Sequence, residues 1–212
     1  SSTQDITVTI TDVDDVAPVF TSNATFSAAE NQTAIGTVTA TDTDTDDSSI
    51  VFSVSGSELA ITSGGVLTFV SAPDYETKSS YSATVTASDG TNSSTQDITV
   101  NVTNVNEKPV ITSASSFSVD ENQTDIGRVI AIDVDGDAIT YSVLKEADHE
   151  SVDIDSENGI LVFRSAPNYE TSSSYTVSVS VSDGEFEEKQ VIQITINDVN
   201  DAPYFTDWRN SN

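Results

Sequence analysis

Acidic residues gather in short runs whose oxygen atoms are suited to hold a hard cation. The run "DTDTDD" covers residues 42–47, and "DVDGD" covers residues 133–137. Calcium prefers carboxylate, amide and carbonyl oxygens, and the chain has no cysteine that could supply thiolates to softer metals. Neither run is an EF-hand loop, because the position that requires Glu holds Ser53 or Leu144. These residues therefore indicate cation binding of another kind.

The charge of the whole chain supports a cation and excludes several partners. The 212 residues include 35 Asp and Glu but only 7 Lys and Arg, which gives a formal net charge of −28. This charge repels the phosphates of nucleic acids and anionic lipid headgroups, so we expect neither nucleic acid nor direct membrane insertion. Self-repulsion also opposes compaction unless something neutralises it, and divalent ions such as Ca²⁺ could do so.

Residues for enzymatic chemistry are scarce. His149 is the only histidine, it lies between Asp148 and Glu150, and we expect it at the surface. Without cysteine or a second histidine, a nucleophilic triad would need an unusual base. We therefore expect no enzyme activity and no catalytic residues.

Internal repeats show which elements must position the acidic residues. "SSTQDITV" occurs at residues 1–8 and again at 93–100, "AAENQTAIGTV" (28–38) matches "VDENQTDIGRV" (119–129), and "SAPDYET" (71–77) matches "SAPNYET" (165–171). Such self-similarity is the signature of a repeat architecture. It predicts the last strand and linker of an upstream repeat at 1–17, repeats at 18–108 and 109–202, and the start of a downstream repeat or a tail at 203–212.

Apolar residues alternate with polar ones inside each repeat, which is typical of half-buried strands. Tyr175, Val177, Val179 and Val181 share one face, and residues 6, 8 and 10 follow the same period. Gly-containing turn signals, such as Asn158-Gly159, separate these segments. About seven short strands in roughly ninety residues, without helical periodicity, favour an immunoglobulin-like β-sandwich.

The order of the acidic motifs resembles the tandem cadherin repeat, and more closely its bacterial cadherin-like form. The matching features are a Glu near the start of each repeat, an Asp-x-Asp after the second strand, an acidic-x-Glu loop, an Asp-Gly turn and an Asp-x-Asn-Asp-x-Pro linker. The resemblance covers essentially the whole chain. It implies an all-β protein with two tandem immunoglobulin-like, cadherin-type Greek-key sandwiches joined by a short calcium-binding linker.

The resemblance also implies which side chains would hold calcium. The junction between the two repeats would use Glu30, Asp74, Glu76, Asn104, Asn106, Glu107, Asp133, Asp135 and Asp183. A partial site before the first repeat would use Asp12, Asp14, Asp15, Asp42, Asp44 and Asp89. A partial site after the second repeat would use Glu121, Asn168, Glu170, Asp198, Asn200 and Asp201.

The central linker, "NVNEKP", departs from the family pattern. Asn104 stands where the pattern has Asp, Glu107 also replaces Asp, and Lys108 follows directly. Each change removes or repositions negative charge, so we expect weaker calcium binding at this junction. We expect Lys108 to offer only its carbonyl and to point its amine outward.

Three functions remain open. The first is a calcium-rigidified repeat pair in a longer cell-surface or secreted adhesion protein. The second is a calcium-dependent carbohydrate-binding module, because similar doublets occur in secreted proteins of polysaccharide-degrading bacteria, and Trp208 could stack on a sugar. The third is association between copies of the chain itself. A swapped dimer, in which residues 1–8 replace residues 93–100 of another molecule, would be one form of that association.

Overall fold

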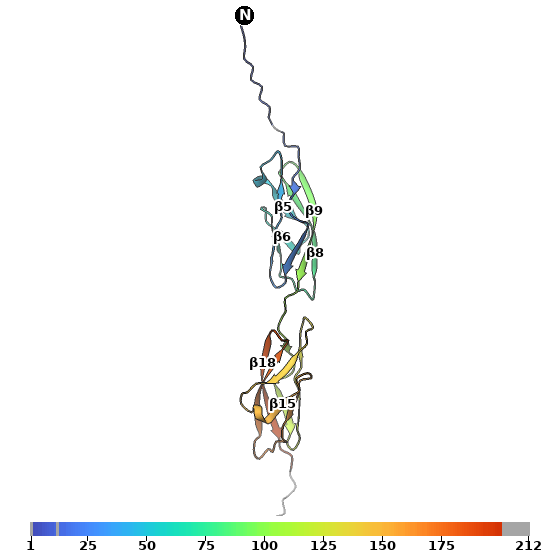
Figure 1. Ribbon diagram of the computed structural model, residues 1–212, viewed down its shortest axis with the longest axis vertical. Coiled ribbons are helices and arrows are strands. Elements are labelled where there is room, and N and C mark those ends of the chain that lie inside the picture. Colours follow the sequence, from blue (N-terminus) through green and yellow to red (C-terminus); the bar gives the residue numbers. More distant parts are fainter. Residues whose placement is uncertain (1, 12, 201–212) are drawn as a thin grey trace, which may run out of the picture. The chain divides into compact units, whose positions relative to one another are not determined.

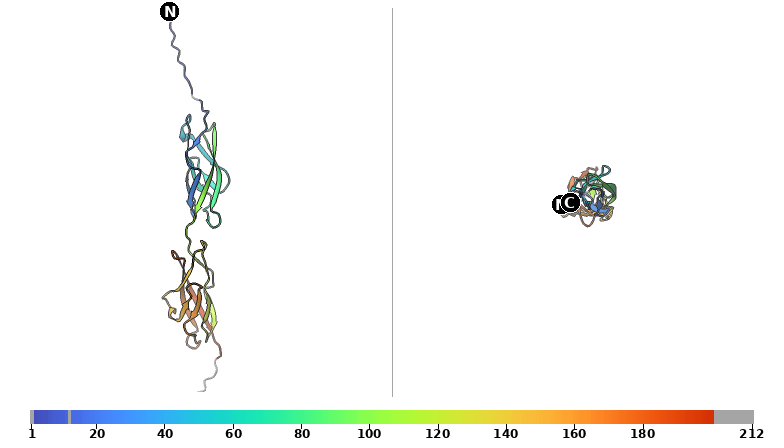
Figure 2. Two further views of the ribbon diagram at one scale, coloured as in Figure 1. Left: turned by 45° about the vertical axis from the view of Figure 1, so that its right-hand side comes forward. Right: turned by 90° about the horizontal axis from the view of Figure 1, so that it is seen from above.

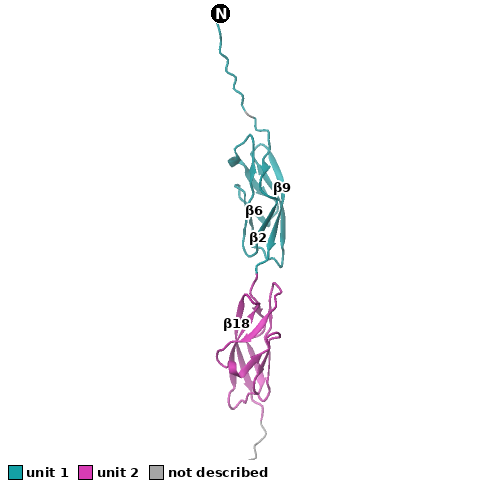
Figure 3. Ribbon diagram, viewed as in Figure 1, with its two compact units in different colours: residues 1–105 teal, residues 106–212 magenta. Residues whose placement is uncertain are grey.

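The protein consists of two β-sheet units, shown in a computed structural model that describes residues 2–11 and 13–200. Unit 1 is Ser1–Val105 and unit 2 is Asn106–Asn212 (Figure 3). The only helical segments among the described residues are two 3-10 turns, η1 (Asp47–Ser49) and η2 (His149–Ser151). In this part of the chain no helix is long and apolar enough to cross a bilayer.

Unit 1 contains a four-stranded sheet of order β2-β9-β8-β5 and a three-stranded sheet of order β3-β7-β6, while β1 pairs with β4 (Figure 1). The bounds are β1 (Val19–Phe20), β2 (Thr25–Ala29), β3 (Ala34–Thr37), β4 (Ala40–Thr41), β5 (Val51–Val54), β6 (Leu59–Ile61), β7 (Val66–Phe69), β8 (Ser80–Ser88) and β9 (Ser93–Thr103).

Unit 2 repeats this topology, with sheets β11-β18-β17-β14 and β12-β16-β15 and the pair β10-β13. The bounds are β10 (Val110–Ile111), β11 (Ser116–Asp120), β12 (Asp125–Arg128), β13 (Ala131–Ile132), β14 (Thr140–Val143), β15 (Val152–Ile154), β16 (Ile160–Phe163), β17 (Ser174–Ser182) and β18 (Glu187–Asn197). The long strands of each unit run side by side, which the turned view of Figure 2 also shows.

The alternating apolar residues form a separate core in each unit. On β18, Ile192, Ile194 and Ile196 are all at most 2% exposed, and Val177 and Val179 on β17 are fully buried. Burial of each such side chain contributes about 1.5–3 kcal/mol. On β18 the period of two therefore correctly indicates the face that packs inward, whereas on β17 Ser178 and Ser180, between the valines, are buried as well.

The first two strands of each unit are interrupted, so the seven expected strands occur as nine segments. In unit 1, β1 pairs antiparallel with β4, whereas β2 pairs parallel with β9 in the register Thr25↔Thr99 to Ala29↔Thr103. Because of the interruption, the first part of this stretch, β1, pairs with β4 and the second part, β2, pairs with β9.

Residues 2–11 differ from the sequence-based expectation, because they contain no strand. Ile6, Val8 and Ile10 are 81%, 79% and 91% exposed, although they match the buried Ile98, Val100 and Val102 of β9. Alternation alone does not produce a strand, because a strand needs a neighbouring strand with which to pair its backbone. The alternation therefore does not form a strand within this chain, and the assignment of residues 1–17 to an upstream repeat stays a prediction.

Two glycines of unit 1 provide a matched test of the turn chemistry. Gly65 and Gly56 both have φ of 85°, but a Cβ at Gly65 would collide with the carbonyl oxygen of Val38, whereas a Cβ at Gly56 would meet open space. We expect Gly56→Ala to cost only the strain of a positive φ, about 1 kcal/mol, and Gly65→Ala to cost clearly more. Urea unfolding followed through amide resonances of unit 1 would measure both. Equal losses in the two variants would contradict the assigned contact.

Candidate metal centres

A buried glutamate follows the second strand segment of each unit and holds three parts of that unit together. Glu30 in unit 1 and Glu121 in unit 2 are each 3% exposed. The Glu30 carboxylate accepts hydrogen bonds from the backbone N–H of Tyr75 (2.8 Å, at Oε2) and of Val105 (2.8 Å, at Oε1). Each oxygen thus uses one acceptor position on the protein and keeps another for a cation.

Unit 2 repeats this arrangement with nearly the same geometry. The Glu121 carboxylate accepts from the N–H of Tyr169 (2.9 Å) and of Val199 (2.9 Å). Oxygens of Glu121, Glu170 and Asp198 lie within 4.8 Å of one another. The structure therefore brings together three of the side chains predicted for the site after the second repeat, at the end of β18.

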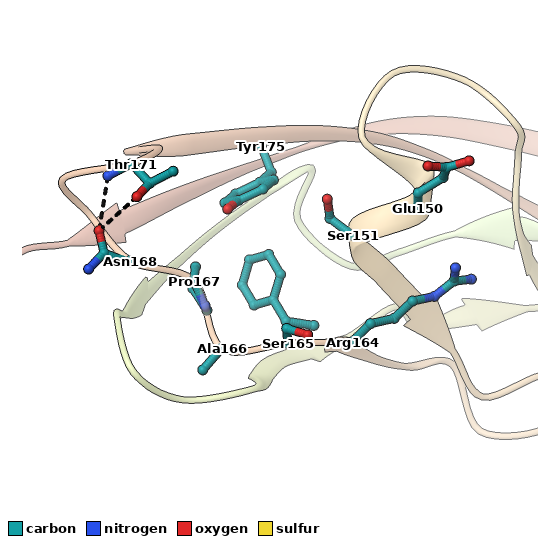
Figure 4. Close-up of a pocket in the computed structure, with 10 residues that line it drawn as sticks. Glu150, Ser151, Arg164, Ser165, Ala166, Pro167, Asn168, Thr171 and Tyr175 are labelled. Atoms are coloured by element: carbon teal, nitrogen blue, oxygen red, sulfur yellow. Dashed lines mark hydrogen bonds between the residues drawn. The ribbon is translucent and has the colours of Figure 1, made fainter.

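The other members of that predicted set are Asn168, Asn200 and Asp201. Asn168 turns back on its own loop, where Oδ1 accepts from the N–H (3.0 Å) and the hydroxyl (3.1 Å) of Thr171 (Figure 4). Asn200 is exposed in the segment after β18, and Asp201 lies outside the described residues.

The equivalent end of unit 1 holds the predicted Glu30, Asp74, Glu76 and Asn104. One carboxylate oxygen of Glu30 and one of Glu76 lie within 4.8 Å of each other. Asp74 caps its own turn, as Asn168 does in unit 2: its two oxygens accept from the N–H and the hydroxyl of Thr77, both at 3.0 Å. Asn104 is exposed directly after β9.

The opposite end of unit 1 contains a second acidic group, formed by the loops after β4 and β8. β9 separates the two ends by eleven residues, or about 36 Å at roughly 3.3 Å per residue. Here Asp42 Oδ1 accepts from the N–H of Asp44 (3.1 Å), and Asp89 Oδ1 accepts from the N–H of Asn92 (2.6 Å). These bonds fold the two loops around their own aspartates.

The segment before β1 joins this group. The backbone N–H groups of Asp15 and Val16 donate to Asp44 Oδ2 at 2.9 and 3.0 Å, and the side chain of Asn92 donates to Asp14 Oδ1 at 3.2 Å. Hydrogen bonding to the Asp42 carboxyl, followed by the Asp15 N–H, holds the pKa of Asp44 below its ordinary value. The predicted Asp12 lies outside the described residues.

Several carboxylate oxygens in this group are buried without a hydrogen-bond partner. They are Asp42 Oδ2, Asp44 Oδ1 and Asp89 Oδ2. Each aspartate uses one oxygen for the loop and leaves the other inside the group. A buried acceptor that makes no hydrogen bond is costly, and several adjacent anionic acceptors repel one another. The chemistry that fits such an all-oxygen group is that of a hard cation.

Unit 2 has the same arrangement at the corresponding end. Glu107 N–H donates to Asp135 Oδ2 (2.8 Å), as Asp15 N–H does to Asp44, and Asn106 Nδ2 donates to Asp183 Oδ2 (3.1 Å). Asp133 Oδ2 is again buried without a hydrogen-bond partner.

Backbone donors also stabilise the ionised form of Asp183. The N–H of Phe186, then that of Glu185, and the Asn106 side chain lower the pKa of Asp183. The carboxylate is therefore charged well into the acid range.

Asp137 is a member of this group that sequence reasoning missed. Its oxygens lie within 4.8 Å of those of Asp133 and Asp135. The "DVDGD" run was the available signal. The matching residue in unit 1, Asp46, instead caps η1 by accepting from the N–H of Ser48 (2.9 Å), because two additional residues lengthen that loop.

The Lys108 amine lies at the surface, where it pairs with Glu188 at 2.5 Å and 59% of the side chain is exposed. That the Lys108 carbonyl joins a metal site stays a prediction. The linker lysine therefore adds its charge to the surface of unit 2 rather than to the carboxylate group.

Two family models match the chain. Residues 24–103 match the Cadherin domain, and residues 106–197 match the Bacterial Ig domain. Among curated proteins, Cadherin EGF LAG seven-pass G-type receptor 2 of Mus musculus is 30% identical over 220 residues, which are 94% of this chain and 8% of the receptor. Receptor 1 of this group in Homo sapiens is 32% identical over 227 residues, 97% of this chain and 8% of the receptor. The chain thus spans only a small part of these relatives.

Solved structures share the fold. Human protocadherin-24 EC1-2 superimposes with a TM-score of 0.66 at 23% identity, over 88% of this chain and 100% of that one. Protocadherin gamma B2 extracellular cadherin domains 1-5 gives 0.61 at 24% identity, over 90% of this chain and 42% of that one. The cadherin match in unit 1, the curated cadherin relatives and the shared fold together support a cadherin repeat family for this chain.

Proposed function

We propose that this chain is a calcium-binding pair of cadherin repeats that stiffens an extracellular adhesion protein. The observation that carries the proposal is the set of buried oxygens without hydrogen-bond partners on Asp42, Asp44, Asp89 and Asp133. They occupy equivalent loops in both units, so the arrangement is a property of the repeat. Calcium takes six to eight oxygen ligands at about 2.3–2.6 Å and would satisfy these acceptors while cancelling their mutual repulsion.

The protein side chains suit calcium better than other common metals. Every candidate ligand is a carboxylate, an amide or a backbone carbonyl, and the sequence has no cysteine and one histidine. Such oxygen-only sets favour calcium or magnesium over zinc or copper. Irregular loops with many carboxylates suit the flexible coordination of calcium more than the strict octahedron of magnesium.

The linker would couple the ions to the joint between the units. Val105 N–H is bound by Glu30 of unit 1, and Glu107 N–H is bound by Asp135 of unit 2. Only Asn106 lies between these two anchored residues. We propose that calcium ions held by Glu30 and Glu76 of unit 1 and by Asp133, Asp135 and Asp183 of unit 2 restrict rotation about this short segment.

The extracellular assignment and the adhesion role come from the relatives. The structures that share this fold include extracellular cadherin domains, and the curated relatives are cadherin receptors. Association between copies remains a prediction. The carbohydrate alternative relied in part on Trp208, which lies outside the described residues.

Replacing the equivalent aspartates with asparagine tests calcium binding directly. Asp42→Asn and Asp133→Asn each keep the Oδ1 acceptor that the loop needs but remove one charge. We expect each to weaken calcium binding at its own end by about tenfold or more, the loss typical of a ligand-shell change. Isothermal titration of the full chain would measure this.

The matched control is Asp97→Asn. Asp97 accepts from the Thr84 hydroxyl (2.7 Å) in the middle of the β8–β9 pair, far from both acidic ends. The affinity of this variant for calcium should equal that of the parent chain. Parental affinity in both Asp42→Asn and Asp133→Asn would overturn the assignment of these groups.

Acid should release the ions only at low pH. Hydrogen bonding to the Asp42 carboxyl and the Asp15 N–H lowers the pKa of Asp44, and the N–H groups of Phe186 and Glu185 lower the pKa of Asp183. Both carboxylates therefore stay charged below the ordinary range for Asp. Because their folded pKa is depressed, their contribution is present above that range and is lost as pH falls through the depressed value. We expect calcium affinity to be nearly constant from pH 7 to about pH 5 and to collapse below about pH 4. Titrations across this range would check it.

Small-angle scattering tests whether calcium restricts the motion between the two units. Small-angle scattering of the full chain with calcium should give a narrower distribution of interunit distances than scattering with chelator. The double variant Glu76→Gln/Asp135→Asn should scatter like the chelated chain even in calcium. Identical curves for the parent chain in both conditions would remove the stiffening role while leaving calcium binding untouched.

A further inference from the structure

The two units share a pair of packed aromatic rings, called the aromatic corner here, beside the loop that follows β7 in unit 1 and β16 in unit 2. Phe69 and Tyr81 in unit 1 meet edge to face, with ring centroids 5.0 Å apart at 66°, and Phe163 and Tyr175 in unit 2 meet at 5.0 Å and 63°. The backbone around them is also equivalent, because Val70 N–H donates to Glu58 and Arg164 N–H donates to Ser151, both at 2.9 Å. The aromatic corner therefore has the same ring packing and the same backbone hydrogen bond in both units.

In unit 1 a lysine of the same unit covers this corner. The Lys78 amine lies 4.3 Å from the centre of the Tyr81 ring and pairs with both oxygens of Glu58 at 2.6 and 2.7 Å. The tyrosine face attracts the cation, and the carboxylate neutralises it. The hollow beside these residues measures about 190 Å³.

In unit 2 the residues that cover the corner are replaced. Ser172 stands where unit 1 has Lys78, and Ser151 stands where it has Glu58. The hollow is correspondingly larger, about 350 Å³, and it extends from Tyr175 past Pro167 to Asn168 and Thr171 (Figure 4). Asn168, at one end of the hollow, stands two residues before Glu170 of the acidic group at the end of β18.

Two opposite charges line the rim of the hollow. Arg164 pairs with Asp153 at 2.7 Å, with half of the Arg164 side chain exposed. Glu150 lines the same rim and can act as a counter-ion, as Glu58 does in unit 1. The net charge of −28 draws basic partners and repels acidic ones.

We propose that the hollow over Tyr175 receives a lysine side chain of a basic protein partner, in the place that Lys78 occupies over Tyr81. The tyrosine face would meet the ammonium group, Pro167 would contact the methylene stem, and Glu150 with the Ser151 hydroxyl would accept from the amine. Unit 2 would thus be the recognition unit of the pair, and unit 1, whose corner is already filled, would not.

The test uses NMR spectroscopy of the full chain in saturating calcium. The probe is an acetyl-Gly-Lys-Gly-amide peptide, and the matched control is the same peptide with norleucine, which keeps the stem but lacks the charge. We expect the lysine peptide to shift the Tyr175 ring signals and to leave those of Tyr81 unchanged. Its affinity should exceed that of the norleucine peptide by at least about threefold, as expected for an exposed cation–π contact.

Exchanging residues between the units gives the decisive variants. Ser151→Glu/Ser172→Lys copies the pair of unit 1 into a corner of the same geometry and should abolish the shift at Tyr175. Glu58→Ser/Lys78→Ser should make Tyr81 respond to the peptide.

Three results would overturn the proposal. They are a Tyr175 shift that survives in Ser151→Glu/Ser172→Lys, equal responses to the lysine and norleucine peptides, or a response to glucose without one to the lysine peptide. Calcium binding is tested separately, through Asp42→Asn and Asp133→Asn.

Discussion

The loops at the ends of both units are constrained by carboxylates that lie close together and repel one another. Each loop at the ends of the sandwiches closes around a carboxylate that accepts backbone N–H groups, as Glu30 does for Tyr75 and Val105. These bonds shape the loops, but they also collect negative charge that the protein itself does not neutralise. The stability of the loops and the proposed affinity for a cation would therefore have the same origin, because the oxygens that do not bind the backbone are the ones left facing one another.

Repetition made much of the architecture predictable from the sequence. A motif that recurs in phase must occupy the same place in two copies of one fold, so the order of the residues alone is enough to pair Glu30 with Glu121. The period of two likewise indicated the buried face of β18. Residues 2–11 show the limit of this reasoning, since their alternation is equal to that of β9 but no strand pairs with them.

Local hydrogen bonding explains why the candidate ligands were only partly predictable. Asp74 and Asp137 are both acidic residues beside a motif, yet Asp74 bonds to Thr77 in its own turn, while Asp137 lies with Asp133 and Asp135. The outcome depends on whether a neighbouring hydroxyl or N–H can reach the carboxylate, which is decided by loop length. The two additional residues in the loop of unit 1 divert Asp46 to η1 in the same way. Sequence spacing does not carry this information.

The parallel pairing of β2 with β9 determines how a unit would respond to tension. The chain enters the unit through β1, passes directly into β2 and leaves from the end of β9, and the five register pairs between β2 and β9 run in the same direction. Traction on the two ends of the unit therefore slides one strand along the other and loads all the bonds between them together, instead of opening them one at a time. A module with this strand arrangement resists stretching cooperatively, because the hydrogen bonds between β2 and β9 bear the load at the same time.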